Sequence, residues 1–282
     1  MKLVRYGSAR NERPGIVDES GNIRDITHCL KDISSQHLTE ENINQLFQLN
    51  LTKLPVAATV DTIRIGPCIH QVGKLICVAY NSKQHLQEMG LPVPDEIVFF
   101  LKASSAIIGP TDPIFYPKLG KKLDWEAELA MIIGKEGKNI KEEEALEYVL
   151  GFTCINDLSD RYWQFDKVPN QHGAGKSFDT LAPLGPYLIT KDEIGDLNNI
   201  RLQCLVNNEI RQDFTVSDSI RSPQQLISHL SRIFTLYPGD VIAIGTGAGT
   251  AKTWGNTFLK PGDEIVLRTD IFGTQKNLII ME

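Results

Sequence analysis

The sequence has few cysteines and no long apolar run, and these two absences narrow the class of protein. Its five cysteines are odd in number, scattered, and never spaced as C-x-x-C, so we expect reduced and mostly buried thiols. No stretch approaches the roughly 18 apolar residues of a membrane span, and the first residues lack the apolar core of a signal peptide. We therefore expect a cytoplasmic protein that does not insert into a membrane.

The sequence also lacks an excess of positive charge. It has 29 Lys and Arg against 35 Asp and Glu, which gives a formal net charge of -6. This net negative charge argues against nucleic acid or an anionic membrane as the main partner. The chain has no internal repeat, and its 41% hydrophobic and 23% charged residues are typical of a globular protein that can bury a sizeable core.

Strand and turn patterns divide the chain near residue 70. Residues 1–35 read as short strands with turns, and a helix capped by Thr39 should follow. Farther along, apolar runs predict buried strands, and residues 140–150 and 223–234 have the periodicity of amphipathic helices. We expect a small β-rich N-terminal domain over residues 1–70 and a larger domain over residues 71–282.

Two carboxylates stand together at the start of one predicted strand. In an extended chain, side chains two residues apart point the same way, so Glu126 and Glu128 share a face. A third carboxylate, Asp157, follows a second apolar strand. Three oxygen ligands without His or Cys suit Mg²⁺, Mn²⁺ or Ca²⁺ rather than Zn²⁺. The alternative is a solvated strand edge with ordinary surface acids, because Glu-x-Glu is a common string.

A histidine and a glutamate lie three residues apart on a short predicted helix that Ser82 could cap. On a helix, His85 and Glu88 share a face and could form a hydrogen bond. A carboxylate in this position fixes the imidazole tautomer and raises its basicity, so the pair could act as a general base. An exposed polar helix turn is the alternative.

Further polar residues follow the third carboxylate. Arg161 and Gln164 project to the same side as Asp157 if a helical turn begins there, and an Arg near a metal suits a substrate carboxylate. Lys176 lies in a Gly-rich loop and is either a surface lysine or one held in a pocket. Near the C-terminus, backbone N–H groups after Gly245 could hold a small carboxylate, with Thr246 adding a hydroxyl.

Seven motifs occur in one order along the chain. They are Tyr80-Asn81 with His85-x-x-Glu88, Glu126-Ala127-Glu128-Leu129, Asn156-Asp157-x-Ser159-x-Arg161 with Gln164, Lys176-Ser177-x-Asp179-Thr180, Pro183-Leu184-Gly185-Pro186, Pro238-Gly239-Asp240-Val241-Ile242, and Gly245-Thr246. Together they resemble the fumarylacetoacetate hydrolase family over about residues 70 to 282, and its bacterial acylpyruvase-type members in particular.

The resemblance implies an α+β fold, with a mixed β-sheet roll or barrel and peripheral helices, that is usually a homodimer. It also implies roles for the residues above. Mg²⁺ or Mn²⁺ (Ca²⁺ is an alternative) would be bound by Glu126, Glu128 and Asp157. Water would be activated by His85 and Glu88 on a mobile helix. The oxo-acid substrate and its developing enolate would contact Arg161, Gln164 and Lys176, and the substrate carboxylate would contact Thr246.

The implied activity is metal-dependent hydrolysis of a C–C bond in an acylpyruvate or another 1,3-diketo acid related to fumarylacetoacetate. Decarboxylation of oxaloacetate, or a lyase, isomerase or dehydratase reaction of a 2-oxo acid, is the alternative on the same scaffold. A non-catalytic protein that binds Ca²⁺ and a small carboxylate is a third. One departure is Gly247, which stands where most members have proline, and we expect it to loosen the loop that shapes the pocket.

Overall fold

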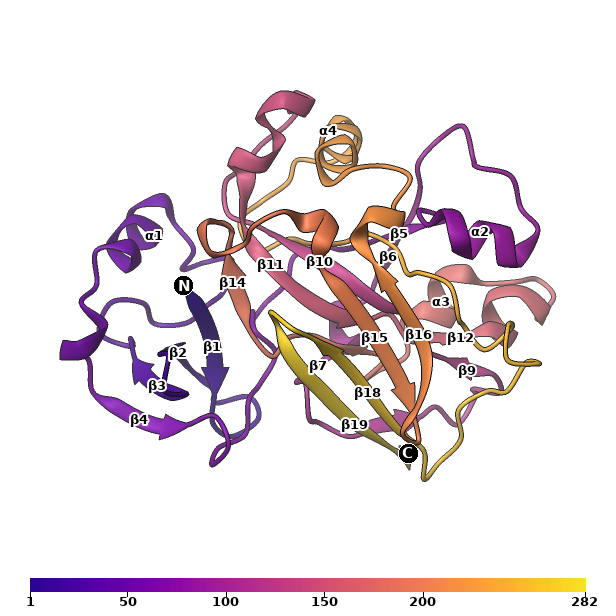
Figure 1. Ribbon diagram of the computed structural model, residues 1–282, viewed down its shortest axis with the longest axis horizontal. Coiled ribbons are helices and arrows are strands. Elements are labelled where there is room, and N and C mark those ends of the chain that lie inside the picture. The colour runs from indigo at the N-terminus through magenta and orange to yellow at the C-terminus, as the bar shows by residue number, and fades with distance from the viewer.

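Two large β-sheets and four α-helices make up the chain in the computed structural model, which describes residues 1–282 (Figure 1). The larger sheet has ten strands in the order β4-β3-β2-β1-β14-β11-β10-β17-β5-β6. Its strands are β1 (Lys2–Tyr6), β2 (Arg13–Val17), β3 (Asn22–Asp25), β4 (Val56–Thr59), β5 (Leu75–Ala79), β6 (Val98–Lys102), β10 (Ala127–Ile133), β11 (Val149–Asn156), β14 (Leu188–Thr190) and β17 (Val241–Ala243). The sheet is mixed, because β17 and β5 are parallel and β10 and β11 are antiparallel.

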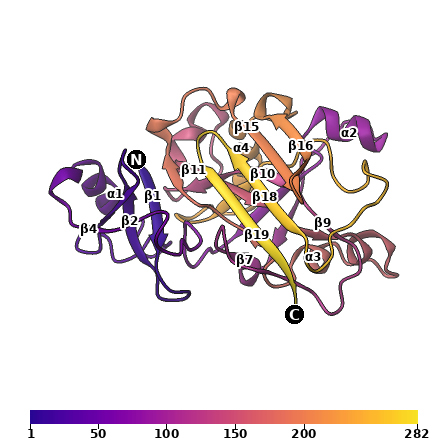
Figure 2. The same ribbon diagram turned by 60° about the horizontal axis from the view of Figure 1, so that its bottom comes forward.

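The second sheet has five strands in the order β16-β15-β18-β19-β8. These strands are β8 (Ile114–Tyr116), β15 (Arg201–Val206), β16 (Glu209–Thr215), β18 (Glu264–Thr269) and β19 (Gly273–Met281). Figures 1 and 2 both show β15, β18 and β19 lying across β10 and β11. The largest hydrophobic cluster, of 34 buried residues, includes side chains from both sheets, such as Met131, Phe152 and Leu267. Burial of this apolar layer is what holds the two sheets together.

Short elements complete the fold. The remaining strands are β7 (Ile107–Ile108), β9 (Leu123–Asp124), β12 (Ser159–Asp160) and β13 (Ala182–Pro183). The helices are α1 (Glu40–Phe47), α2 (Lys83–Met89), α3 (His172–Lys176) and α4 (Pro223–Ile233). None of them combines the length and the apolar content that crossing a bilayer requires.

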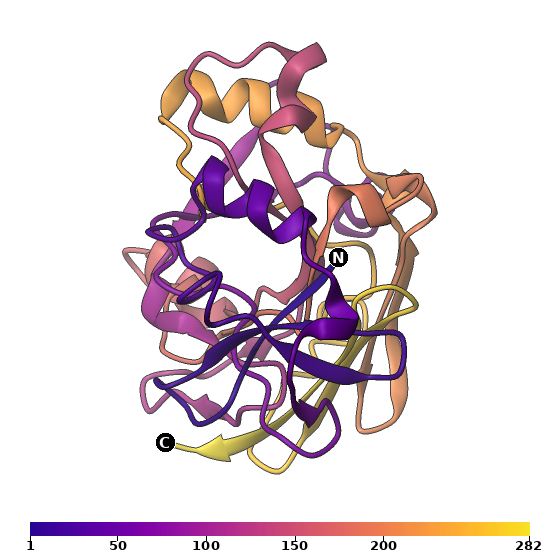
Figure 3. The same cartoon turned by 90° about the vertical axis from the view of Figure 1, so that its left-hand side faces the viewer.

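The N-terminal strands are joined to the rest of the chain through the larger sheet. Strand β1 pairs with β14, so that Lys2 lies opposite Ile189 and Leu3 opposite Leu188. Figure 3 views the molecule from this end, with the N-terminal segment in front. A second hydrophobic cluster contains residues from both sides of residue 70. The division into domains at that residue stays a prediction, and the hydrogen-bonded sheet is continuous across it.

The predicted α+β class is confirmed, and both large sheets have free edge strands, so neither closes into a barrel. The N-caps predicted at Thr39 and Ser82 are also confirmed. Each accepts a hydrogen bond from a backbone N–H in the first turn of its helix, and Ser222 caps α4 in the same way. These bonds satisfy donors that a helix cannot pair internally.

The predicted helix over residues 140–150 is wrong in type and extent. A 3₁₀ helix covers Glu142–Tyr148, and Val149 and Leu150 already belong to β11. Val149 pairs with Ile133 of β10. Because Val149 belongs to the sheet, a helix cannot continue through it. The apolar run from residue 149 onward is therefore a buried strand, and its apparent helical period comes from the short turn before it.

Candidate active site

Three carboxylates meet at one end of the paired strands β10 and β11. Because the strands are antiparallel, the residue before β10 and the residue after β11 lie at the same end. The Asp157 N–H donates to the Glu126 carbonyl at 2.8 Å, and the Glu126 N–H donates to Asn156 Oδ1 at 3.0 Å. One carboxylate oxygen each from Glu126, Glu128 and Asp157 lies within 4.8 Å of the other two. The predicted ligand set is thus assembled by strand register alone.

Two buried lysines lie against these carboxylates. The Lys176 ammonium donates to Glu126 Oε2 and, at 2.8 Å, to Asp157 Oδ2. The Lys102 ammonium donates to the other oxygen of Asp157 at 2.5 Å and to the Leu158 carbonyl at 2.8 Å. Lys176 is therefore a pocket lysine, as one reading of the Gly-rich loop allowed. Lys102, the last residue of β6, is a site residue that the sequence reasoning missed.

Glu128 is the carboxylate of the cluster without a cation partner. It is 1% exposed, and its recorded hydrogen bond comes from the Gly245 N–H at 2.8 Å. Burial, together with the negative charges of Asp157 and Glu126, raises the pKa of Glu128 well above its ordinary value. A buried carboxylate with a raised pKa needs an additional positive charge beside it in order to ionise. The donor set therefore fits a divalent cation of the Mg²⁺ or Mn²⁺ type, held by oxygen atoms alone.

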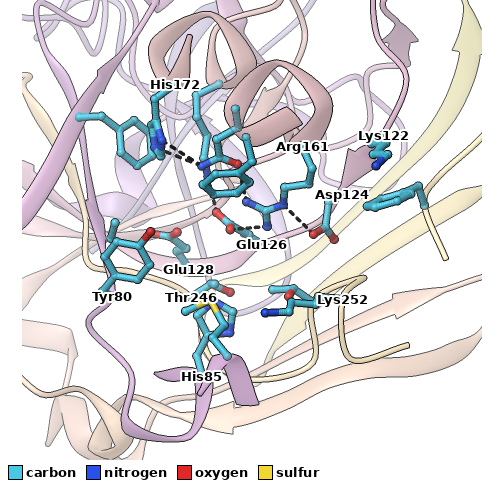
Figure 4. Close-up of a pocket in the computed structure, with 18 of the residues that line it drawn as sticks. Tyr80, His85, Lys122, Asp124, Glu126, Glu128, Arg161, His172, Thr246 and Lys252 are labelled. Carbon is cyan, nitrogen blue, oxygen red and sulfur yellow. Dashed lines mark hydrogen bonds and ion pairs between the residues drawn. The ribbon is translucent and has the colours of Figure 1, made fainter. Parts of the chain in front are cut away.

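Arg161 ties the cluster to a second acid. Its guanidinium donates to Glu126 Oε1 at 2.6 Å and to Asp124 Oδ2 at 2.8 Å, and it also donates to Gln164 Oε1 at 2.8 Å (Figure 4). Burial alone would raise the pKa of Glu126, but the positive charges of Arg161 and Lys176 hold it well below its ordinary value. Glu128 therefore keeps its proton to a higher pH than Glu126 does.

Gln164 connects Arg161 to a histidine. Since Gln164 Oε1 accepts from Arg161, its Nε2 group is left to donate, and His172 Nε2 lies 3.1 Å from it. The imidazole nitrogen that faces Gln164 is then an acceptor, and His172 is neutral there. Burial and the nearby Lys176 charge lower the pKa of His172, in agreement with this assignment.

The His85–Glu88 pair is formed and is fixed at both ends. His85 Nδ1 lies 3.3 Å from Glu88 Oε2, and the His85 N–H donates to the N-cap Ser82 at 3.0 Å. The Gly249 N–H donates to both Glu88 oxygens, at 2.9 and 3.1 Å. Burial alone would raise the pKa of Glu88, but its hydrogen bonds from His85, Thr253 and Gly249 outweigh this effect and lower it. Helix α2 is therefore docked against the loop that follows β17.

Most of these groups line one pocket with a cavity volume of about 190 Å³. Seven of the predicted residues line it: His85, Glu126, Glu128, Arg161, Gln164, Lys176 and Thr246. The other two lie behind this wall, Asp157 within the carboxylate cluster and Glu88 behind His85. Figure 4 labels five of the predicted lining residues, namely His85, Glu126, Glu128, Arg161 and Thr246.

Several lining residues were missed in the sequence. They are chiefly Tyr80, Phe100, Lys122, Asp124, His172, Lys252 and Phe258. Asp124 lies two residues before the predicted metal ligand Glu126, and this spacing could have indicated that it belongs to the site. Lys102 ends an otherwise apolar strand, where a lone charge is also unusual. Lys122 and Lys252 lie in turn-rich segments, where no sequence pattern predicts that a lysine lines a pocket.

The loop after β17 differs from the expectation. The Thr246 hydroxyl donates to the Ala127 carbonyl at 2.9 Å and accepts from Gln212 Nε2 at 2.9 Å, so it faces the strand. A Cβ at Gly247 would lie 2.3 Å from the Phe214 ring, which explains why a bulkier residue such as proline does not fit there. The loop packs against β16 through this contact and through the Gln212 hydrogen bonds, so it is anchored without the proline.

The comparisons with known proteins agree with this geometry. The family model for the fumarylacetoacetate (FAA) hydrolase C-terminal region matches residues 74–280. A Burkholderia ambifaria protein named "Putative hydrolase" is 39% identical over 277 residues, which cover 98% of this chain and 97% of that protein. The chain therefore belongs to the fumarylacetoacetate hydrolase family.

Two solved structures are similar over the whole chain. The fumarylacetoacetate hydrolase from psychrophilic Exiguobacterium antarcticum has a TM-score of 0.86 and 33% identity and is covered completely, as is this chain. The maleylpyruvate hydrolase from Sphingobium sp. SYK-6, in complex with manganese(II) and pyruvate, has a TM-score of 0.82 and 26% identity, with 100% of this chain and 99% of that chain covered. Both are named as hydrolases, and a neighbour from Mycobacterium smegmatis is named as an isomerase.

Proposed function

We propose that the protein is a divalent-metal-dependent hydrolase that cleaves a C–C bond in acylpyruvates. The observation that carries the proposal is the placement of the His85–Glu88 pair in the wall of the same pocket as the three-carboxylate cluster. A base and an acid-only metal site facing one cavity are what hydrolysis of a 1,3-diketo acid requires. The manganese(II) and pyruvate in the maleylpyruvate hydrolase complex support the same assignment.

The base is oriented for proton abstraction. The Glu88 carboxylate accepts from His85 Nδ1, which leaves Nε2 with its lone pair as the base. In the proposed reaction Nε2 takes a proton from water, and the resulting hydroxide adds to the distal carbonyl carbon. The C–C bond to the pyruvate unit then breaks, and its electron pair passes to the enolate of pyruvate. His85 returns the proton to the enolate carbon, so the products are a carboxylic acid and pyruvate.

The remaining groups bind the 2-oxo acid and its enolate. Lys176 is positioned to stabilise the developing negative charge, since it is buried and rigidly held. The substrate carboxylate would be received by Arg161 and by the N–H of Thr246, which has no partner among the hydrogen bonds of the protein. A divalent ion held by Glu126, Glu128 and Asp157 would supply the Lewis acidity that polarises the 2-oxo group.

The test is pyruvate release from acetylpyruvate, measured with Mg²⁺ or Mn²⁺ and again with EDTA. We expect release that EDTA abolishes and added metal restores. Replacement of His85→Ala should lower kcat by about 100-fold or more, as loss of a general base does. His229→Ala is the matched control, because His229 lies on α4 away from this pocket and should leave kcat unchanged.

Other outcomes would replace the proposal. Release of pyruvate from oxaloacetate alone, insensitive to His85→Ala, would identify a decarboxylase that uses the same enolate without attacking water. Tight binding of 2-oxo acids without turnover of any diketo acid would identify a binding protein. Full acetylpyruvate turnover by Glu126→Gln would show that the carboxylate cluster is not the metal site.

A further inference from the structure

One cation in the pocket wall has no anionic partner. The other lysines and the arginine that line or adjoin the pocket each lie within ion-pair distance of a carboxylate: Lys122 with Asp166, Arg161 with Asp124 and Glu126, Lys102 and Lys176 with Asp157. Lys252 also lines the pocket, yet it takes part in no salt bridge and no hydrogen bond of its side chain. Its charge is therefore available to a ligand.

The backbone at Lys252 is fixed on both sides. The preceding residue, Ala251, is buried, and its N–H donates to Asp124 Oδ1 at 2.9 Å. Asp124 in turn binds Arg161 through its other oxygen. Two residues after Lys252, the Trp254 indole N–H donates to the Arg211 and Gly249 carbonyls, each at 3.2 Å. The ammonium is thus presented to the pocket by a segment anchored to the site itself.

Lys252 lies on the side of the pocket that contains His85. Figure 4 shows it in the same part of the cavity as Thr246 and His85. In the proposed reaction His85 faces the distal carbonyl, so the acyl group of the substrate extends from that carbonyl along the pocket lining. The lining includes Met89 and Phe258, which offer apolar surface to a carbon chain, and Lys252, which offers a charge.

We infer that Lys252 selects acylpyruvates whose acyl group ends in a second carboxylate. This inference rests on the proposed function and specifies its substrate class. A carboxylate on the acyl chain would accept a charge-assisted hydrogen bond from the ammonium, whereas a neutral acyl group would leave the charge without a partner. Lys252 is exposed to solvent, so its contribution is moderate and is screened by salt.

The experiment compares two ligands that differ only in the distal group. The binding of 2-oxoadipate and of 2-oxohexanoate to the Mn²⁺-loaded protein is measured by calorimetry, because neither contains the diketo unit that is cleaved. We expect 2-oxoadipate to bind roughly three- to fivefold more tightly at low salt, with a smaller preference at high salt. Replacement of Lys252→Met should abolish the preference, and Lys252→Arg should retain most of it.

The matched control is Lys260→Met, which removes an exposed lysine of the same segment outside the pocket. It should leave the preference intact. An equal affinity of the wild-type protein for both ligands, or a preference that survives Lys252→Met, would overturn the inference.

Acetylpyruvate turnover separates this inference from the proposed function. It tests the hydrolase without involving a distal carboxylate, and Lys260→Met, outside the pocket, should leave its kcat/KM unchanged. Normal acetylpyruvate turnover without a preference for 2-oxoadipate would overturn only the role of Lys252. Absence of turnover with a clear binding preference would overturn only the hydrolase.

Discussion

Lys102 offers the sharpest test of the site, because its removal should have different effects with and without metal. Its side chain is 0% exposed and bonds Asp157 Oδ1 at 2.5 Å. Replacement by methionine keeps most of the apolar side chain but leaves Asp157 with Lys176 as its remaining cation, 2.8 Å from the other oxygen. The metal-free protein then holds an under-compensated buried carboxylate.

The expected cost follows from the burial. Removal of one partner of a buried ion pair typically costs about 3–5 kcal/mol, and the lower end applies because Lys176 still faces Asp157. We therefore expect Lys102→Met to lower the free energy of unfolding by about 3 kcal/mol without metal. A divalent ion restores positive charge beside Asp157, so the loss should fall to about 1 kcal/mol at saturating Mn²⁺. Urea unfolding in EDTA and in Mn²⁺ gives both values.

Lys74→Met is the matched control. Lys74 pairs with the buried Asp240 at 2.6 Å, away from the carboxylate cluster. Its loss should destabilise the protein equally in EDTA and in Mn²⁺. If the cost of Lys102→Met were the same in both conditions, or larger with metal, the assignment of Asp157 as a metal ligand would be refuted.

Three further predictions concern protons and thiols. The pKa of Glu128 is raised, so metal binding should displace its proton: the affinity for Mn²⁺ should weaken as the pH falls, and Glu128→Gln should remove this dependence. The folded pKa of Glu88 lies below its ordinary value of 4.5, so the stability it contributes is present above that pH and is lost as pH falls through the folded pKa; urea unfolding of wild type and Glu88→Gln should differ by a constant amount above about pH 5.5 and converge in acid. Burial raises the pKa of the Cys68 thiol to about 12, and Cys77, Cys154 and Cys204 are also buried with raised pKa values, so a thiol reagent at pH 8 should modify only Cys29 in the native protein and all five thiols in urea.

The parts of the site that were predictable are those that local rules determine. Glu126 and Glu128 were recognised because strand geometry places alternate side chains on one face. The His85–Glu88 pair was recognised because helix geometry brings residues three apart together. The assembly of Asp157 with the glutamates depends on the pairing of β10 with β11, which the resemblance implied and the strand register explains. The roles assigned to these residues stay predictions until activity is measured, and so does the homodimer.

The parts that were missed depend on long-range contacts. Lys102 reaches Asp157 across 55 positions of sequence, and no pattern in β6 reveals that partner. The direction of the Thr246 hydroxyl is set by Ala127 and Gln212, which come from two other strands. The helix expected over residues 140–150 failed for a related reason, because strand pairing overrode a local helical period.

The attachment of Glu88 to a backbone N–H has a consequence for how the family can diversify. Gly249 binds Glu88 through its main chain, and its own Cβ position would lie 2.0 Å from the Arg211 carbonyl, so the glycine itself is constrained. Among the residues that follow, Thr253 adds a side-chain hydrogen bond to Glu88, whereas Lys252 and Asn256 make none to it. Lys252 and Asn256 both line the pocket. In the proposed hydrolase, substitutions at these two positions would therefore change the acyl group that is accepted while Glu88 keeps its bond to Gly249.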